Sequence, residues 1–299
     1  MNHKQSLLVL LLVAVVVTTI SCKKIVQSEF PDIEQKPVVN SIIVQDSTIK
    51  INVSLSGKLD SNDLTFVDNA TIFLYIDDVL AETINHSADG MYISNIIAEP
   101  NKKYSSIVKI PGYEDVKCSC KIPPKTDLLD VTLTNLAYID SEGTIFPSVA
   151  IKFRNNPDTL LYYEIAIKNL RYDSYYERND DFYASLVGIE DPVLINEGLP
   201  IAVFSNQIIT GNEYTMTLNY FTMGTSWNLS HLYPIIVELR SISSEYYNYA
   251  QALYLYKEQL GNESIDGRIL PLSIYSNVEN GYGIFAGYSI NATDTIYPN

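Results

Sequence analysis

The sequence predicts a mainly β fold. We expect an N-terminal immunoglobulin-like antiparallel β-sandwich, followed by a second β-rich, sandwich-like domain that carries one amphipathic helix. Short runs of β-branched and aromatic residues alternate with polar residues, and turn-forming Asn, Asp, Gly and Pro separate them. Only one stretch has a clear helical period. With 299 residues and 46% apolar residues, the chain is long enough to bury a core and to form about two domains.

The first 21 residues predict a lipoprotein signal peptide. Lys4 precedes an apolar run from Leu7 to Val17, which is shorter than the about 20 residues that a membrane span needs. The small residue Ser21 then stands directly before Cys22. We therefore expect lipidation of Cys22 and attachment to the lipid bilayer through its acyl chains. The alternative is a plain secretory signal that is cleaved nearby.

The rest of the chain divides into three parts. Residues 22–35 are polar and unpatterned, which is typical of a tether. Residues 36–124 hold the strands of the first sandwich, and the pair Pro123-Pro124 ends them because proline removes a backbone donor. Residues 125–299 form the predicted second domain.

The strands of the first domain follow from alternation and turn signals. In the run 48–55, isoleucine, valine and leucine occupy every second position, which indicates a half-buried strand. Asp, Asn and Gly pairs separate the neighbouring runs, as they do in the turns of antiparallel sheets. The other expected strands are 38–44, 70–76, 79–84, 91–93, 104–110 and 116–122.

The second domain combines further strands with the one predicted helix. The helix is expected over 243–260, because tyrosine, alanine and leucine recur there at helical spacing and Gly261 is a typical terminator. A serine at 243 or 244 is suited to cap its start. The expected strands are 128–137, 148–153, 160–170, 214–221 and 235–242.

A long charged excursion over residues 172–199 interrupts these strands. Long excursions are often functional, and this one is rich in tyrosine, whose rings suit contacts with sugars or proteins. We expect a candidate binding surface at its tyrosines, although half-exposed strand residues would give the same pattern. The candidate residues are Tyr172, Tyr175, Tyr176 and Tyr183.

Two cysteines lie two positions apart on one face of the last strand of the first domain. Cys118 and Cys120 either form a disulfide or are two small buried thiols. The strand geometry is marginal for a disulfide, because its Cα atoms must lie within about 6.8 Å of each other.

The sequence contains no pattern that indicates a cofactor or a metal site. The histidines beyond the signal, His86 and His231, are far apart along the chain, and no HExxH, Walker or GxSxG motif is present. The formal net charge of −15 disfavours nucleic-acid binding, since acidic proteins repel phosphates. Enzymatic activity is therefore not expected.

Several segments carry a resemblance to a known family. They are the Cys22 lipobox, the opening strand at 36–40, the Ile122-Pro123-Pro124 junction and, most specifically, the run SNVENGYGIF at 276–285. In these the chain resembles the domain-of-unknown-function family numbered forty-two forty-nine, a group of Bacteroidetes lipoproteins. The resemblance implies an outer-membrane protein that works beside a TonB-dependent uptake receptor. Lys23 and Lys24 follow the cysteine where exported members often carry acidic residues, so the periplasmic face and the cell surface both stay open.

These observations together predict a non-enzymatic lipoprotein anchored in the outer membrane. We expect it to bind a partner protein or a nutrient as an accessory to a TonB-dependent uptake system. Two alternatives stay open: a membrane-anchored hydrolase of glycans or peptides, and a structural adhesin. The hydrolase requires clustered carboxylates, or a histidine beside a nucleophile, in one cleft.

Overall fold

The structure is a computed structural model that describes residues 34–57, 65–173, 178–179, 181–222, 232–266 and 273–298. Strands dominate it, and the helices within these residues are α2 (Pro192–Glu197) and α3 (Ser244–Asp266). The described residues from 35 onward belong to one compact unit. The prediction of a mainly β, sandwich-like fold with antiparallel sheets is confirmed.

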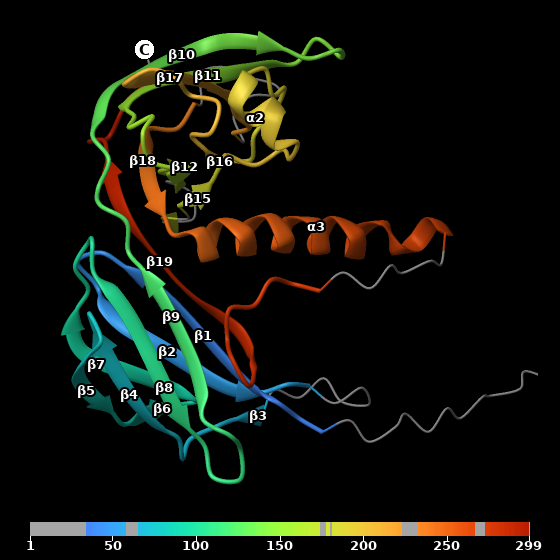
Figure 1. The fold of residues 1–299 in the computed structure, drawn as a ribbon. Helices are drawn as coiled ribbons and strands as arrows, with labels where there is room; N and C mark the ends of the chain where they lie inside the picture. Colours follow the sequence, from blue (N-terminus) through green and yellow to red (C-terminus); the bar gives the residue numbers. More distant parts are fainter. Residues whose placement is uncertain are drawn as a thin grey trace, which may run out of the picture. The chain divides into compact units, whose positions relative to one another are not determined.

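One large sheet runs through this unit (Figure 1). Its ten described strands are β1 (Pro37–Val44), β2 (Thr48–Leu55), β3 (Thr65–Phe66), β6 (His86–Ala88), β7 (Met91–Ile97), β12 (Tyr162–Asn169), β15 (Phe182–Tyr183), β16 (Val203–Ser205), β18 (Ile235–Ile242) and β19 (Tyr282–Ala292). Their order is β15-β12-β18-β19-β1-β2-β7-β6, with β16 beside β12 and β3 beside β2.

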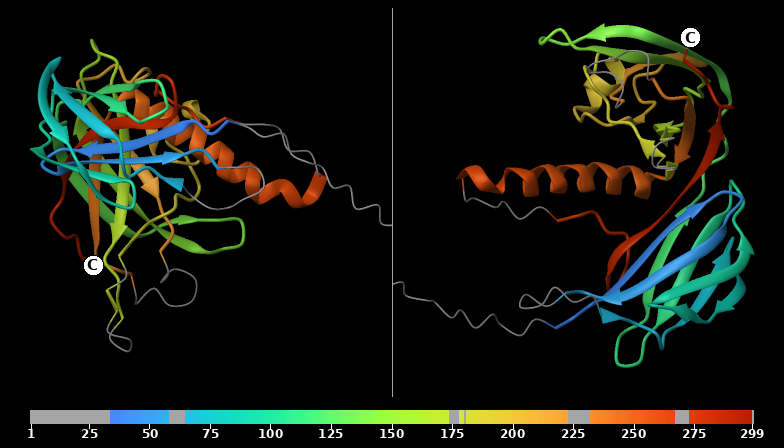
Figure 2. Two further views of the ribbon diagram at one scale, coloured as in Figure 1. Left: turned by 90° about the horizontal axis from the view of Figure 1, so that it is seen from below. Right: turned by 180° about the vertical axis from the view of Figure 1, so that it is seen from behind.

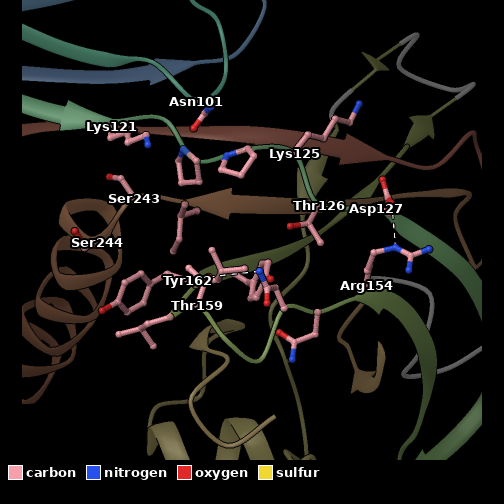
Figure 3. Close-up of a pocket in the computed structure, with 18 of the residues that line it drawn as sticks. Asn101, Lys121, Lys125, Thr126, Asp127, Arg154, Thr159, Tyr162, Ser243 and Ser244 are labelled. Carbon is pink, nitrogen blue, oxygen red and sulfur yellow. Dashed lines mark hydrogen bonds and ion pairs between the residues drawn. The ribbon is translucent and has the colours of Figure 1, made fainter. Parts of the chain in front are cut away.

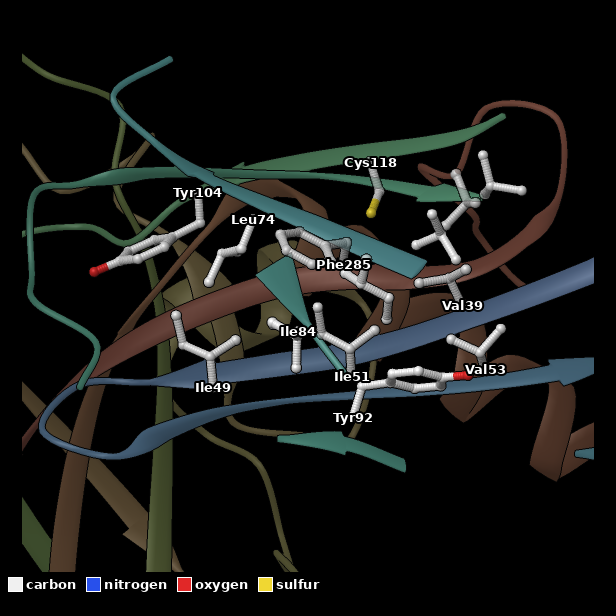
Figure 4. Packing of buried hydrophobic residues seen from close by; sticks show 14 of the residues in the cluster. Val39, Ile49, Ile51, Val53, Leu74, Ile84, Tyr92, Tyr104, Cys118 and Phe285 are labelled. Carbon is white, nitrogen blue, oxygen red and sulfur yellow. The ribbon is translucent and has the colours of Figure 1, made fainter. Parts of the chain in front are cut away.

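The first hydrophobic core lies between one half of this sheet and a second sheet of order β5-β4-β8-β9 (Figure 4). Alternating residues of β1 and β2, such as Val39 and Ile51, meet Leu74 and Tyr104 of the second sheet there, and all four are at most 1% exposed. The period of two in these strands directs every second side chain into this core. The strands of the second sheet are β4 (Thr71–Ile76), β5 (Val79–Ile84), β8 (Lys103–Lys109) and β9 (Val116–Lys121).

A second core lies between β12 and β18 on one side and a sheet of order β10-β11-β17 on the other. Aromatic residues fill its centre, where Phe153 contacts the rings of Tyr163, Phe204 and Tyr214. The strands of this sheet are β10 (Leu128–Ile139), β11 (Ile145–Arg154) and β17 (Glu213–Asn219).

Strand β19 joins the two halves of the large sheet. Its first residues pair in parallel with β1, and its last residues pair antiparallel with β18; Figure 2 shows β19 beside β1 in two further views. Gly283 makes the parallel pairing possible, because its φ is +119° and a Cβ there would lie 2.0 Å from the carbonyl oxygen of Val39. One sheet therefore contributes to both cores, and the division at residue 124 stays a prediction.

Two local predictions need correction. The helix continues past Gly261 to Asp266, because one glycine inside a helix costs only about 1 kcal/mol. The excursion over 172–199 contains the short helix α2, which Asp191 caps through its side chain and Gly198 ends at φ +76°. It also contains a small pair of strands, β13 (Tyr172–Asp173) and β14 (Arg178–Asn179). None of the described helices has the length and apolarity required to cross a bilayer.

Candidate functional site

The structure describes only part of the predicted tyrosine surface. The backbone of Tyr172 lies in β13 and pairs with Asn179, whereas Tyr175 and Tyr176 lie outside the described residues. Tyr183 ends β15, beside β12, and the residue is 55% exposed. Cys22 also lies outside the described residues, so its lipidation stays a prediction.

Tyr183 borders a buried charge cluster that is centred on Arg240. Register places Glu164 of β12 directly opposite Arg240 of β18, while Glu238 lies two positions before it on the same face of β18. Arg240 Nη1 donates to Glu164 Oε2 at 2.8 Å, and its Nε donates to Glu238 Oε2 at 2.9 Å. Only 11% of the Arg240 side chain is exposed. The guanidinium thus has a carboxylate partner on each of two strands.

Tyrosine rings enclose the same guanidinium. Its Cζ lies 5.1 Å from the ring centroid of Tyr183 and 5.2 Å from that of Tyr288, which is within cation–π distance. Tyr246 of α3 donates its hydroxyl to Glu164 Oε2 at 3.0 Å. We call these six residues the Arg240 cluster: Glu164, Tyr183, Glu238, Arg240, Tyr246 and Tyr288.

The electrostatics of the cluster follow from burial and pairing. Burial disfavours the charged form of Arg240, but the charge of Glu164 and the hydrogen bonds to Glu164 and Glu238 outweigh it and raise its pKa above the usual value. Burial, and then the nearby carboxylate of Glu164, raise the pKa of Tyr246. Arg240 therefore stays charged and the Tyr246 hydroxyl stays protonated at neutral pH.

Three members of the cluster, Glu164, Tyr183 and Arg240, contribute to one wall of a cavity of about 640 Å³, which we call the α3 pocket. A second wall is one face of α3, where the lining residues recur at helical spacing: Tyr246, Tyr249, Ala250, Leu253, Tyr254, Lys257 and Glu258. The third wall consists of Pro200, Ile201 and Ala202. Along 244–259, where the helix side chains are described, none is fully buried. The helix therefore leaves an open space along the sheet instead of closing against it.

A separate set of contacts holds α3 in place. Glu197, the last residue of α2, accepts hydrogen bonds from the Tyr247 hydroxyl at 2.5 Å and from Gln251 Nε2 at 3.1 Å. Its other oxygen accepts from the backbone N–H and the hydroxyl of Ser205 in β16. The Tyr247 ring also contacts Tyr162, with centroids 4.6 Å apart. Burial and Glu197 raise the pKa of Tyr247 to about 12.

A second cavity of about 610 Å³ lies at the junction after the first predicted domain (Figure 3). Pro123, Pro124 and the first residues of α3 line it. Arg154 and Asp127 form an ion pair in its wall at 3.1 Å, but their side chains are 57% and 66% exposed. Exposed ion pairs contribute little binding energy, so the buried Arg240 cluster is the better candidate for a specific site.

The structure also places the other candidate residues. His86 Nε2 lies 2.8 Å from Asp68 Oδ1, and its ring contacts Tyr92 in an edge-on arrangement. His231 lies outside the described residues. Within the described part of the chain, no group of three or more His, Cys, Asp or Glu side chains could hold a metal ion.

Cys118 and Cys120 both point into the first core from β9 and are free thiols in this structure. Burial raises the pKa of Cys118 to about 12 and that of Cys120 well above its usual value. Such thiols are poor nucleophiles at neutral pH.

Sequence reasoning missed the centre of the site. Glu238 and Arg240 lie in a strand that the sequence predicts, at alternate positions among apolar residues. The sequence signal that could have indicated the site is this pair of opposite charges, Glu238 and Arg240, on the face of the strand that points away from the core. Their partner Glu164 is 76 positions from Arg240, and only the strand register reveals that pair.

Comparison with known proteins places the chain in a family. No curated protein matches the sequence. A family model described as a domain of unknown function, DUF4249, matches residues 23–294, which is nearly the whole chain after the predicted signal peptide. The chain therefore belongs to the DUF4249 family.

Proposed function

We propose that this protein is a non-enzymatic lipoprotein of the outer membrane that binds a nutrient or a partner protein beside a TonB-dependent uptake receptor. The observation that supports binding is the α3 pocket, a cavity of about 640 Å³ that combines apolar walls with a few fixed polar groups. The predicted lipid on Cys22 supplies the anchor.

Preorganisation is the reason to assign binding to this pocket. Arg240 is held by two carboxylates and two rings, so little side-chain entropy is lost when a ligand arrives. Arg and Tyr are also the residue types that dominate binding energy at interfaces. A ligand that enters the pocket therefore meets groups already in position.

Co-purification of envelope partners tests the proposal. The full chain with an affinity tag is recovered from detergent-solubilised membranes after cross-linking, and we expect a TonB-dependent receptor among the proteins recovered with it. The matched control is Cys22→Ala, which removes only the predicted acylation site and should lose the receptor. Recovery of no envelope protein with the wild-type chain would contradict the proposal.

One observation favours a second candidate, an anchored hydrolase. Glu164 lines the α3 pocket, and Glu238 shares its partner Arg240, so two carboxylates lie near each other, as a glycosidase requires. Both, however, direct Oε2 at the same guanidinium, and Glu238 does not line the pocket, so the two carboxylates do not face each other across it. Incubation with oligosaccharides separates the two functions: binding returns the sugar intact, whereas a hydrolase releases fragments and loses this activity in Glu164→Gln.

A further inference from the structure

The charges that line the α3 pocket balance. Glu164 and Glu258 carry negative charge, and Arg240 and Lys257 carry positive charge. Arg240 is moreover already paired with Glu164 and Glu238. Glu238, which pairs with Arg240 but does not line the pocket, adds one negative charge beside it and disfavours an anionic ligand. A cationic ligand would have to compete with Arg240 and Lys257 for the carboxylates and displace buried pairs, which is costly. The pocket is therefore suited to an uncharged ligand.

Its polar groups are suited to hydroxyl groups. Glu164 uses Oε2 for both of its hydrogen bonds, to Arg240 and to Tyr246, and within the described residues Oε1 remains able to accept from a ligand. The hydroxyls of Tyr183 and Tyr246, two residues that line the pocket, donate to carboxylates, which leaves their oxygen atoms the capacity to accept a hydrogen bond. A ligand that both donates and accepts through the same group matches this arrangement.

Its apolar groups are flat rings. Three half-buried tyrosines of α3, which are Tyr246, Tyr249 and Tyr254, lie along one face of the helix, and the exposed Tyr183 of β15 also lines the pocket. Tyrosine presents a large apolar face with one polar edge, and its two rotatable bonds limit the entropy lost on binding. Sugar rings have apolar C–H faces and hydroxyl edges, which complement such surfaces.

From these three features we infer that the α3 pocket binds a short neutral oligosaccharide. The inference rests on the proposed function and specifies the ligand class of the same site. Tyr183 and Tyr249 stack on sugar rings, and Glu164 accepts from a sugar hydroxyl. The cavity volume lies within the range of about 300–1,000 Å³ typical of small-ligand pockets.

Calorimetric titration of the full chain in detergent tests the inference. The neutral probes are the hexasaccharides of maltose, cellulose, xylan and mannan. The charged probes are hexagalacturonate and chitosan hexamer, and a serine–alanine hexapeptide represents peptides. We expect at least one neutral sugar to bind, with an affinity that changes less than about twofold between 50 and 500 mM NaCl, because no counterions are released.

Variants locate the binding. Tyr183→Ala and Tyr249→Ala should each weaken it about tenfold or more, which corresponds to about 1.4 kcal/mol, whereas Tyr183→Phe and Tyr249→Phe keep the ring and should retain most of the affinity. Tyr297→Ala is the matched control, since Tyr297 is 69% exposed and outside the pocket lining. Circular dichroism verifies the fold of each variant.

Two results would overturn the inference: no neutral sugar binds, or a charged sugar or the peptide binds more tightly than every neutral one. Equal weakening by Tyr297→Ala would overturn the assignment to this pocket. Failure of the proposed function is seen separately, in the co-purification experiment. If the receptor is recovered but no sugar binds, only the ligand class is wrong.

Discussion

Arg240 combines burial, ion pairing and aromatic contacts at the wall of the α3 pocket. Its guanidinium is nearly buried, two carboxylates neutralise it, and tyrosine rings lie close to it. Burial of a charge is costly unless it is paired and hydrogen-bonded. The cluster is therefore stable only as a unit, and removal of one member should affect the rest.

Arg240→Leu should destabilise the protein by about 3–5 kcal/mol, because it leaves Glu164 and Glu238 as buried carboxylates without their cation. The free energy of unfolding, measured with urea and circular dichroism, checks this. Arg154→Leu is the control, since its pair with Asp127 is exposed and should contribute less than about 1 kcal/mol. Equal losses of unfolding free energy in Arg240→Leu and Arg154→Leu would contradict this prediction. Replacement of Arg240, Glu164 and Glu238 together by leucine should restore most of the stability, because no buried carboxylate is then left without its cation.

Alkaline pH should reveal the contact that holds α3. The folded state raises the pKa of Tyr247 from about 10 to about 12, so its stabilising contribution is complete below pH 10 and is lost as the pH rises through 12. The free energy of unfolding should therefore fall over this interval, and less steeply in Tyr247→Phe. The control Tyr297→Phe should follow the wild type. A Tyr247→Phe variant that falls as steeply as the wild type would contradict the assignment.

At the scale of elements, β19 and α3 define the site. The last residues of β19 pair with β18 and bring Tyr288 to Arg240, while the face of α3 that begins at Tyr246 lines the pocket. Parallel pairing with β1 fixes the first half of β19, and Gly283 is the residue that permits it. A substitution at Gly283 should therefore destabilise both hydrophobic cores.

Gly283→Ala should lower the free energy of unfolding by about 1–3 kcal/mol or more, because the backbone is at φ +119° and the new Cβ would clash with Val39. Gly57→Ala is the matched control, since nothing lies within 4 Å of a Cβ there. Its effect should stay within about 0.5 kcal/mol. Urea unfolding of the two variants checks the difference, and a neutral Gly283→Ala would contradict the described pairing.

The sequence predicts the bounds of single strands better than it predicts which strands pair with one another. The strands 48–55, 79–84 and 235–242 have the predicted bounds, because alternation and turn residues act locally. The short helix α2 was missed, although Asp191, Pro192 and Gly198 are start and stop signals, because six residues are too few to show a helical period. The site itself depends on strand register across 76 positions, which no local pattern encodes.

The whole molecule combines a predicted lipid anchor at Cys22 with the α3 pocket. The sequence predicts a signal peptide, a polar tether and a mature chain that begins at Cys22. A body with a net negative charge would remain soluble beside the membrane, and acyl chains would hold it there. The pocket would then act on ligands that reach the envelope.

Cell fractionation of Cys22→Ala tests this account most directly. The wild-type protein and the control Cys118→Ala, which keeps the first cysteine, should both sediment with the outer membrane. Without its acyl chains, Cys22→Ala should appear in the soluble fraction. Sedimentation of Cys22→Ala with the envelope to the same extent as the wild type would contradict the lipoprotein account.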